Sequence, residues 1–383
     1  TAVTPVDPST IEYVYLLEEL DFADEGTRRP IIGGKSTGFL ALLDAGDVTL
    51  PPDPIGISVR AFIEHTVELV AELEPLLSNP LFNQDALLRA LLLEGPNDWA
   101  LKHPQDPTFP DRFLALRPPS DPMRLLAEAG GAQGRILNRP IAPAALTVIE
   151  DALLDAYGSY ADEQGLRFRS SSNVEDAEGF NGAGLYESWS GALSDAERPI
   201  ADAIRSVWAS LWNARAYDER QLGNIDQHGV AMGILVHPAF LSEQANVIVV
   251  SRDLQDPTRS DVYTLNAQIG EASVANPAPG VSTEELLHHV ALVAGTPELE
   301  YRRQSSLTRG APVLYLQDVQ RISCLVTGIT EHFRPLLDPQ DENRWFAMDV
   351  EVKLTGPGRQ VVVKQARPLS FGRAERPTDC REY

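Results

Sequence analysis

The segment FRSSSNVEDAEGFNGAGLYES, residues 168–188, is the most informative stretch of this chain. It begins within a strand-like run, LRFRSSS, which predicts that Arg169 lies near a strand end. The segment that follows is rich in Ser, Asn and Gly and includes Gly179, Gly182 and Gly184. Such a loop can lay backbone N–H groups over phosphates, and an arginine can bind them with two parallel hydrogen bonds. The alternative is an ordinary mobile surface loop.

A second glycine segment, RRPIIGGKSTGFLALLDAG at 28–46, contains a lysine in a context similar to a P-loop. The P-loop pattern requires a glycine five places before Gly34. That position is Arg29, and Pro30 after it has no N–H group to offer a phosphate. The strict pattern therefore fails, and Lys35 needs another explanation.

The residues around Lys35 still suit an anion. Ser36 is expected to cap a helix over about 37–44 that Gly46 closes. A helix N-terminus beside a lysine favours negative charge. The alternative is a turn with a solvated lysine, and these residues alone do not separate the two.

Charged residues also alternate along two strand-like segments near residue 360, joined by the turn TGPG. Asp349 and Glu351 share one face of the first strand, and Gln365 and Arg367 share a face of the second. If the segments form a hairpin, the two pairs can stand opposite each other. A divalent cation with oxygen ligands would relieve the repulsion between the carboxylates. Metal-binding carboxylates on one strand beside a cationic side chain on the next suit phosphoryl transfer. The simpler alternative is a strand face exposed to solvent.

Composition sets the remaining limits. The 383 residues are enough for two or three domains, and the net charge of −23 argues against nucleic acid or an anionic membrane as the main partner. A small anion in a local basic cleft remains compatible with this charge. The two cysteines, Cys324 and Cys380, imply no disulfide framework, and we expect a cytoplasmic protein with no membrane span.

Periodicity predicts mixed helices and strands. In the first half we expect a strand and then a helix in 54–73, a loop-rich insertion at about 76–123 with one helix at 85–93, a helix within 142–165, and a long helix at 198–220. In the second half we expect strands within 230–240, 246–253 and 261–270, helices at 282–295 and 315–334, and the two closing strands.

Taken in order, these segments resemble the N-terminal nucleotide-binding domain of the phosphoenolpyruvate synthase and pyruvate phosphate dikinase family. The resemblance spans about residues 12–371. Its most specific blocks are VEDAEGFNGAGLYES and KQARP. It also rests on GGKSTGFLALLDAG, VWASLWNARA, QIGEASVANP and EHFRPLLDPQDENRWFAMDVEVKL.

The resemblance implies an α+β chain with an ATP-grasp fold, in which two lobes bind a nucleotide between them. The N-terminal lobe is expected at 1–238, including the insertion at 76–123. The C-terminal lobe is expected at 239–371, and 372–383 is expected to be a tail or linker.

It also implies roles for individual residues. Lys35, Arg169 and Arg367 would be catalytic, with Arg367 stabilising the charge that is transferred. The loop at 179–184 would cradle phosphates. Mg²⁺ would be held by Glu351 and Gln365, with Asp349 close by. The nucleoside end of ATP would lie near Leu235, His237 and Glu271.

The implied function is an ATP-dependent phosphotransferase. It would pass a phosphoryl group to a histidine on a separate swivelling carrier domain, with AMP as the eventual product. The carrier and an acceptor-binding domain are expected outside this chain. We expect His332, His288 and His289 to be structural, the last two on an amphipathic helix.

Two departures from the family pattern support an alternative. His237 and Pro238 replace the customary residues at the hinge, and QANVIVVS lacks the glycine of the corresponding family segment. The alternative is a nucleotide-binding regulatory or assembly module without transfer activity. An ATP-grasp ligase fits the fold but not the KQARP ending.

Overall fold

The computed structural model divides the chain into two units, Thr1–Asp44 with Leu50–Leu241 (unit 1) and Ala45–Thr49 with Ser242–Tyr383 (unit 2). Within the part of the chain that the structure describes, no helix is long and apolar enough to cross a bilayer. The described residues are 3, 5–20, 25–46, 48–158, 165–175, 180, 182, 184–291, 295 and 297–369.

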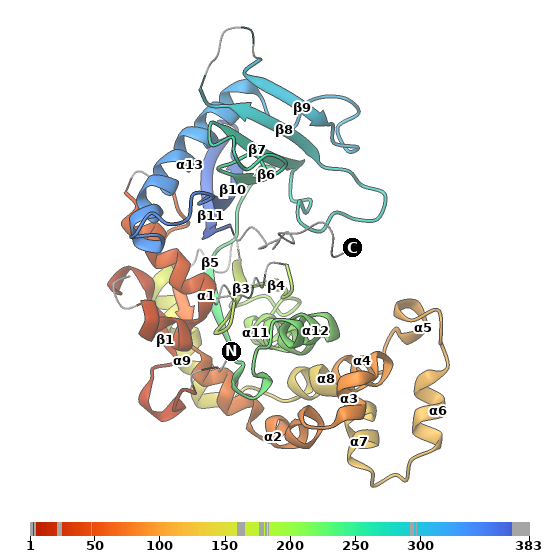
Figure 1. Ribbon diagram of the computed structural model, residues 1–383. Helices are drawn as coiled ribbons and strands as arrows, with labels where there is room; N and C mark the ends of the chain where they lie inside the picture. Colours follow the sequence, from red (N-terminus) through yellow and green to blue (C-terminus); the bar gives the residue numbers. More distant parts are fainter. Residues whose placement is uncertain are drawn as a thin grey trace. The chain divides into compact units, whose positions relative to one another are not determined.

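Unit 1 is built on a five-stranded antiparallel sheet in the order β1-β2-β5-β3-β4 (Figure 1). The sheet brings together segments far apart in the sequence, because β5 inserts between β2 and β3. The strands are β1 (Val14–Leu16), β2 (Ile55–Ile57), β3 (Leu166–Ser172), β4 (Ser188–Gly191) and β5 (Met232–Pro238).

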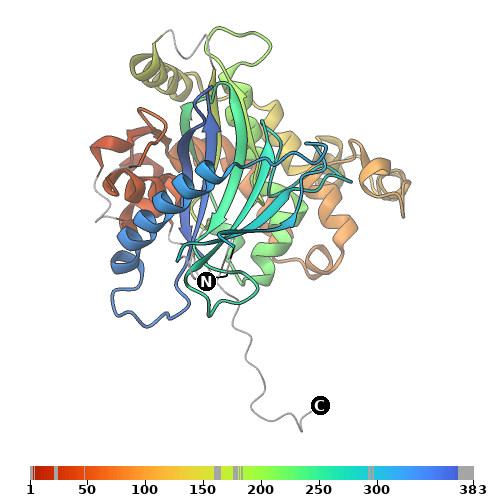
Figure 2. The same ribbon diagram turned by 90° about the horizontal axis from the view of Figure 1, so that it is seen from above.

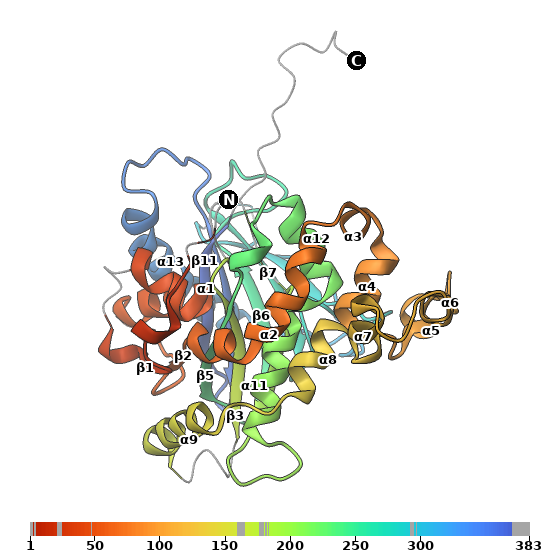
Figure 3. The same cartoon turned by 90° about the horizontal axis from the view of Figure 1, so that it is seen from below.

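Helices α2 (Val59–Leu77) and α11 (Ile200–Ala209) pack on this sheet against β5, and α11 also contacts β3 (Figure 3). Ser58 caps α2 by accepting a hydrogen bond from the Arg60 N–H. The apolar faces of the two helices meet in the core, where the rings of Phe62 and Trp208 form an edge-to-face pair at 6.1 Å. The remaining helical segments of this part of the unit are η1 (Pro8–Thr10), η2 (Leu17–Glu19), α1 (Glu25–Asp44), α8 (Gly131–Asn138), α9 (Pro143–Tyr157) and η5 (Gln227–Gly229).

The stretch at 76–123 is largely helical, in contrast to the loop-rich insertion expected from its composition. Asn79, Asp85 and Asp121 accept hydrogen bonds from backbone N–H groups at helix starts, and prolines occupy first-turn positions in three of the helices. The residues that suggested loops therefore start short helices. These are α3 (Pro80–Gln84), α4 (Ala86–Glu94), α5 (Trp99–Lys102), α6 (Phe109–Ala115) and α7 (Pro122–Glu128).

The long helix expected at 198–220 is interrupted. After α11 the chain forms a 3₁₀ turn, η4 (Ser210–Trp212), and then α12 (Ala214–Leu222). Asn213 is extended, with ψ of 148°, and its side chain accepts a hydrogen bond from the Ala216 N–H. The apolar periodicity continues through the break, so periodicity alone did not reveal this N-cap.

His65 on α2 is buried in the core of unit 1, where it is 6% exposed and its ring lies 5.0 Å from that of Trp208. Its Nε2 donates to the Ile136 carbonyl at 3.0 Å. Burial lowers the pKa of the ring, the hydrogen bond to Ile136 opposes this, and Arg139 and Arg205 lower it further.

This pKa predicts a pH-dependent contribution to stability. The unfolded chain binds a proton at His65 near the ordinary histidine pKa of about 6.5, whereas the folded chain binds it more weakly. Stability therefore falls as the pH drops through that value. At pH 7.5 we expect His65→Leu to lose about 1–3 kcal/mol, the cost of a buried carbonyl without its donor. Urea unfolding should show a smaller difference from the wild type at pH 5.5, and a difference independent of pH would contradict this account.

Unit 2 contains a six-stranded antiparallel sheet in the order β11-β10-β6-β7-β8-β9. Helix α13 (Leu316–Leu337), drawn in blue, lies against one face of it (Figures 1 and 2). The strands are β6 (Glu243–Val250), β7 (Val262–Ile269), β8 (Glu284–His289), β9 (Leu299–Arg303), β10 (Met348–Thr355) and β11 (Gln360–Pro368).

The two faces of this sheet differ in polarity. On the face toward α13, the Tyr263 hydroxyl is hydrogen-bonded to Thr327 Oγ1 at 2.9 Å. On the same face, His288 Nδ1 is hydrogen-bonded to Ser323 Oγ at 2.7 Å. This face is otherwise largely apolar, with Val247, Val249, Leu265, Val350, Val352 and Leu354. By strand alternation the opposite face carries a polar set, Asn246, Asn266, Gln268, Asp349, Glu351 and Lys353.

The helix expected at 282–295 is wrong, because its first part is strand β8. Pairing with β7 and β9 on both sides overrides the helical periodicity of the sequence. Glu284, at the start of the strand, is fully buried and accepts the N–H groups of Val313 and Leu314 at 2.8 and 2.9 Å. His288 and His289 are thus buried strand residues.

Candidate functional site

The GGK segment lies inside α1, at a sharp kink. Gly33 has φ of 80° and ψ of 173°, which breaks the helix between Ile32 and Lys35. The Ser171 hydroxyl enters this break: it accepts the Ser36 N–H at 3.0 Å and donates to the Ile32 carbonyl at 2.7 Å. It replaces the helical bond that would join residues 32 and 36. Ser36 therefore lies inside the helix and does not cap it, so the expected cap is wrong, whereas the expected helix end at residue 44 is confirmed.

The two glycines of GGK are needed for close approach to another segment of the chain. A Cβ at Gly33 would lie 1.7 Å from the Ser171 carbonyl oxygen. A Cβ at Gly34 would lie 2.2 Å from the carbonyl oxygen of Glu175. Both distances are far shorter than a van der Waals contact, so the kink can pack on β3 and the residues after it only with glycine here.

This packing sets the position of Lys35. Its ammonium contacts the Glu175 carboxylate and lies 3.3 Å from Ser170 Oγ. The Glu175 side chain is fully buried, whereas that of Lys35 is 12% exposed. Arg29 also reaches this segment and donates to the Glu175 carbonyl at 3.0 Å.

Glu175 was not identified from the sequence, although it lies within the VEDAE block. The feature of the sequence that could have revealed it is its place: it lies three residues after the end of a predicted strand and next to a glycine-rich segment. Tyr186 lies near it, and burial raises the pKa of this hydroxyl, with the Glu175 charge as a smaller contribution in the same direction.

Arg169 lies on β3 and is buried, with 5% exposure. The register pairs Arg169 with Leu235 on β5 and Arg167 with His237. Alternation places these four side chains on one face of the sheet. Lys35 touches Ser170, the next residue after Arg169. Unit 1 therefore brings Arg169, Leu235 and His237 to one face of the sheet, whereas Lys35 reaches β3 at Ser170, whose side chain alternates to the opposite face.

Of the three loop glycines, Gly179 lies outside the described residues. Gly182 packs against Glu175, since a Cβ there would lie 2.9 Å from Glu175 Cγ. Gly184 has φ of 66°, in the left-handed region.

In unit 2 the expected closing hairpin is confirmed. Strands β10 and β11 pair antiparallel, with Asp349 opposite Arg367 and Glu351 opposite Gln365. Arg367 donates from Nε at 3.0 Å and from Nη2 at 2.7 Å to Asp349 Oδ2. A β-bulge after Glu351 leaves Lys364 as the extra residue of β11.

The bulge adds a cation that sequence reasoning did not anticipate. Lys364 Nζ lies 3.1 Å from Glu351 Oε2. Further along the same face of β10, Lys353 forms an ion pair with Glu243, and both side chains are largely buried. The carboxylates of β10 thus stand among three basic side chains.

Glu271 is exposed and lies just beyond the end of β7. At that end Ile269 pairs with Ala245, whereas Asp349 pairs with Val250 at the other end of β6. Five residues of strand separate the two ends, which corresponds to roughly 17 Å. The structure therefore places Glu271 apart from Asp349 and Arg367.

The donor set of the hairpin suits a hard cation. Asp349, Glu351 and Gln365 offer carboxylate and amide oxygens, the ligands that Mg²⁺ takes. Among the described residues, no three His, Cys, Asp or Glu side chains cluster around a common point. Mg²⁺ commonly uses one or two protein carboxylates and completes its coordination shell with phosphate and water.

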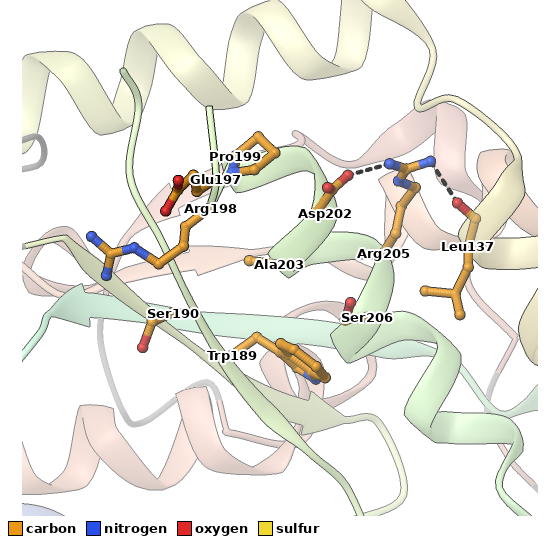
Figure 4. A pocket seen from close by; sticks show the side chains of 10 residues that line it. All are labelled: Leu137, Trp189, Ser190, Glu197, Arg198, Pro199, Asp202, Ala203, Arg205 and Ser206. Carbon is orange, nitrogen blue, oxygen red and sulfur yellow. Dashed lines mark hydrogen bonds and ion pairs between the residues drawn. The ribbon is translucent and has the colours of Figure 1, made fainter. Parts of the chain in front are cut away.

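Unit 1 also has a surface cavity of 390 Å³ between β4 and α11 (Figure 4). Trp189 lines it, and an ion pair joins Asp202 to Arg205, which also donates to the Leu137 carbonyl. None of the site residues predicted from the sequence lines this cavity.

Comparison with known proteins agrees with these features. The sequence model of a protein family, the pyruvate phosphate dikinase AMP/ATP-binding domain, matches residues 29–382 of the chain. The chain belongs to this family. As a member it is a nucleotide-binding domain with an α+β, ATP-grasp type fold.

The chain is also similar in sequence to a curated protein, phosphoenolpyruvate synthase of Aeropyrum pernix. The two chains are 24% identical over 264 residues, which cover 57% of this chain and 30% of the relative. The match thus spans less than a third of the relative's length. The name of this relative supports phosphotransferase chemistry in the family.

Proposed function

We propose that this domain binds Mg-ATP and passes a phosphoryl group to a histidine on a separate carrier domain, with AMP as the eventual product. The observation that supports this best is the register of the closing hairpin. It sets Asp349 and Glu351 opposite Arg367 and Gln365, so oxygen ligands and a cation share one polar face. Phosphoryl transfer requires such an arrangement, because it depends on charge neutralisation and positioning.

In this proposal Lys35 and Arg169 hold the phosphates from unit 1. Lys35 supplies a point charge with rotatable donors, and Arg169 supplies a planar fork that matches two phosphate oxygens. Leu235 and His237, on the same face as Arg169, contact the nucleoside.

From unit 2, Asp349, Glu351 and Gln365 would hold Mg²⁺, which when bound supplies positive charge against the phosphate oxygens. Arg367 exchanges its contact with Asp349 for the transferring group and stabilises its charge. Glu271, at the other end of the strands, lies toward the nucleoside. The separation between the two ends is consistent with a nucleotide extended along the sheet.

A second candidate function is nucleotide binding without transfer. The ion pair between Lys364 and Glu351 favours it, since an ammonium occupies one of the expected metal ligands. The buried His237 and the adjoining Pro238, which depart from the family pattern, point the same way.

Transfer to a carrier distinguishes the two. The chain is incubated with Mg-ATP and the histidine-bearing carrier domain of a dikinase supplied in trans. We expect AMP and an acid-labile phosphate on the carrier. Arg367→Lys keeps the charge but loses the fork, and it should lower the transfer rate by roughly 100-fold.

The control is Arg321→Lys on α13, a half-exposed arginine that pairs with the buried Asp318. It should transfer at the wild-type rate. Thermal stabilisation by Mg-ATP without AMP would support the binding module. The absence of both would contradict both candidate functions.

A further inference from the structure

Glu175 is a fully buried carboxylate beside the lysine expected to bind phosphate. It takes the ammonium of Lys35 through its side chain and the guanidinium of Arg29 through its backbone carbonyl. Removing a buried charge from its partner is costly, so this carboxylate restricts where the ammonium can go.

Glycines on two sides fix the position of Glu175 itself. A Cβ at Gly34 would lie 2.2 Å from its carbonyl oxygen, and a Cβ at Gly182 would lie 2.9 Å from its Cγ. The two glycines belong to the two segments that the sequence singled out for phosphate binding. Glu175 therefore packs directly between them, with no side chain in the way.

The donors of Lys35 can be counted. An ammonium carries three N–H groups. Among the described residues, Glu175 and Ser170 take two of them. The side chain of Lys35 is 12% exposed, and the third N–H group has no acceptor among the described residues.

We propose that Glu175 is a positioning residue for the nucleotide: it holds Lys35 so that its remaining N–H group meets a phosphate oxygen. The inference rests on the proposed function, because it assigns Glu175 a role only if Lys35 binds phosphate. Glu175 itself touches no part of the nucleotide.

The direction in which ATP affinity changes when the Glu175 charge is removed shows whether Glu175 positions Lys35 or only neutralises its charge. A carboxylate near the phosphates repels them, so its removal alone would tighten ATP binding. If Glu175 instead orients Lys35, its removal weakens ATP binding despite the more favourable charge.

The test is calorimetric titration of the wild type and Glu175→Gln with Mg-ATP and, separately, with adenosine. We expect the Kd for Mg-ATP to rise about tenfold, the size expected when one charge-assisted hydrogen bond no longer orients a ligand group. The Kd for adenosine should stay unchanged, because adenosine has no phosphate for Lys35. A merely structural role would weaken both ligands alike.

Further variants test whether a change in ATP affinity comes from misfolding rather than from the loss of positioning. Ser170→Ala removes the second acceptor without leaving a buried charge, and it should weaken Mg-ATP by a smaller factor and spare adenosine. Lys35→Met/Glu175→Gln removes both charges and should bind Mg-ATP no more weakly than Lys35→Met. As a matched control, Asp218→Asn breaks the ion pair of buried Arg89, 2.8 Å long, in the same unit. It should leave the Kd for Mg-ATP unchanged.

Equal or tighter Mg-ATP binding by Glu175→Gln would overturn the inference, as would parallel losses for ATP and adenosine. If the wild type binds Mg-ATP and the variant matches it, only the role of Glu175 fails. If the wild type binds no Mg-ATP, the proposed function fails as well.

Discussion

Gly33→Ala is expected to destabilise unit 1 by about 2–5 kcal/mol, the sum of the strain of a positive φ and an overpacked contact. The new Cβ would lie 1.7 Å from the Ser171 carbonyl oxygen at a φ of 80°. The kink could then persist only if α1 moved away from β3. That movement would also displace Lys35 from Ser170 and Glu175, so the variant should lose nucleotide binding together with stability.

Urea unfolding followed by tryptophan fluorescence measures this loss. Gly158→Ala is the matched control, because Gly158 also has a positive φ, of 53°, but a Cβ there meets no atom of the described residues within 4 Å. It should cost only about 1–2 kcal/mol, the backbone strain alone. Equal losses in the two variants would show that the contact with Ser171 contributes nothing.

Lys35→Ala and Arg367→Ala are each expected to remove the thermal stabilisation given by Mg-ATP, although they lie in different units. A ligand at 100 times its Kd stabilises a protein by about 2.7 kcal/mol. Loss of either cation should raise the Kd enough to abolish most of this shift at the same concentration. Differential scanning fluorimetry with and without Mg-ATP measures it.

The shift is the relevant quantity, because Arg367→Ala also leaves Asp349 without its arginine and lowers the melting temperature of the free protein. Lys102→Ala in unit 1 and Arg321→Ala in unit 2 remove about half-exposed cations and serve as controls. Both should keep the full shift. A full shift in Lys35→Ala or Arg367→Ala would contradict the assigned role of that residue.

The sequence predicted the closing hairpin, with Asp349 and Glu351 opposite Arg367 and Gln365. Alternation has a period of two and groups these residues on one face of each strand, and the TGPG turn indicates the hairpin. The β-bulge after Glu351 sets the final register, because without it Lys364 and Ala366 would face Glu351 and Asp349. Helix α13 was predicted for a similar reason, because its apolar stripe is long and regular. The extra residue Lys364 escaped prediction, since a bulge depends on the partner strand.

Other features depend on contacts between distant segments and were missed. The kink of α1 requires Ser171, 138 positions beyond Gly33, to enter the helix. Strand β8 is helical in its periodicity and extended only because β7 and β9 flank it. Glu175 is indistinguishable by sequence from a solvated loop carboxylate until the GGK segment packs against it.

The central claim is that side chains from both units bind one triphosphate with its magnesium. The most direct measurement is a crystal structure of the chain with Mg²⁺ and a non-hydrolysable ATP analogue. The account predicts Lys35 and Arg169 on the phosphates, with Arg367, Glu351 and Gln365 around the same phosphates and metal ion. A nucleotide bound to one unit alone, with the hairpin residues still paired as Asp349–Arg367 and Glu351–Lys364, would contradict it.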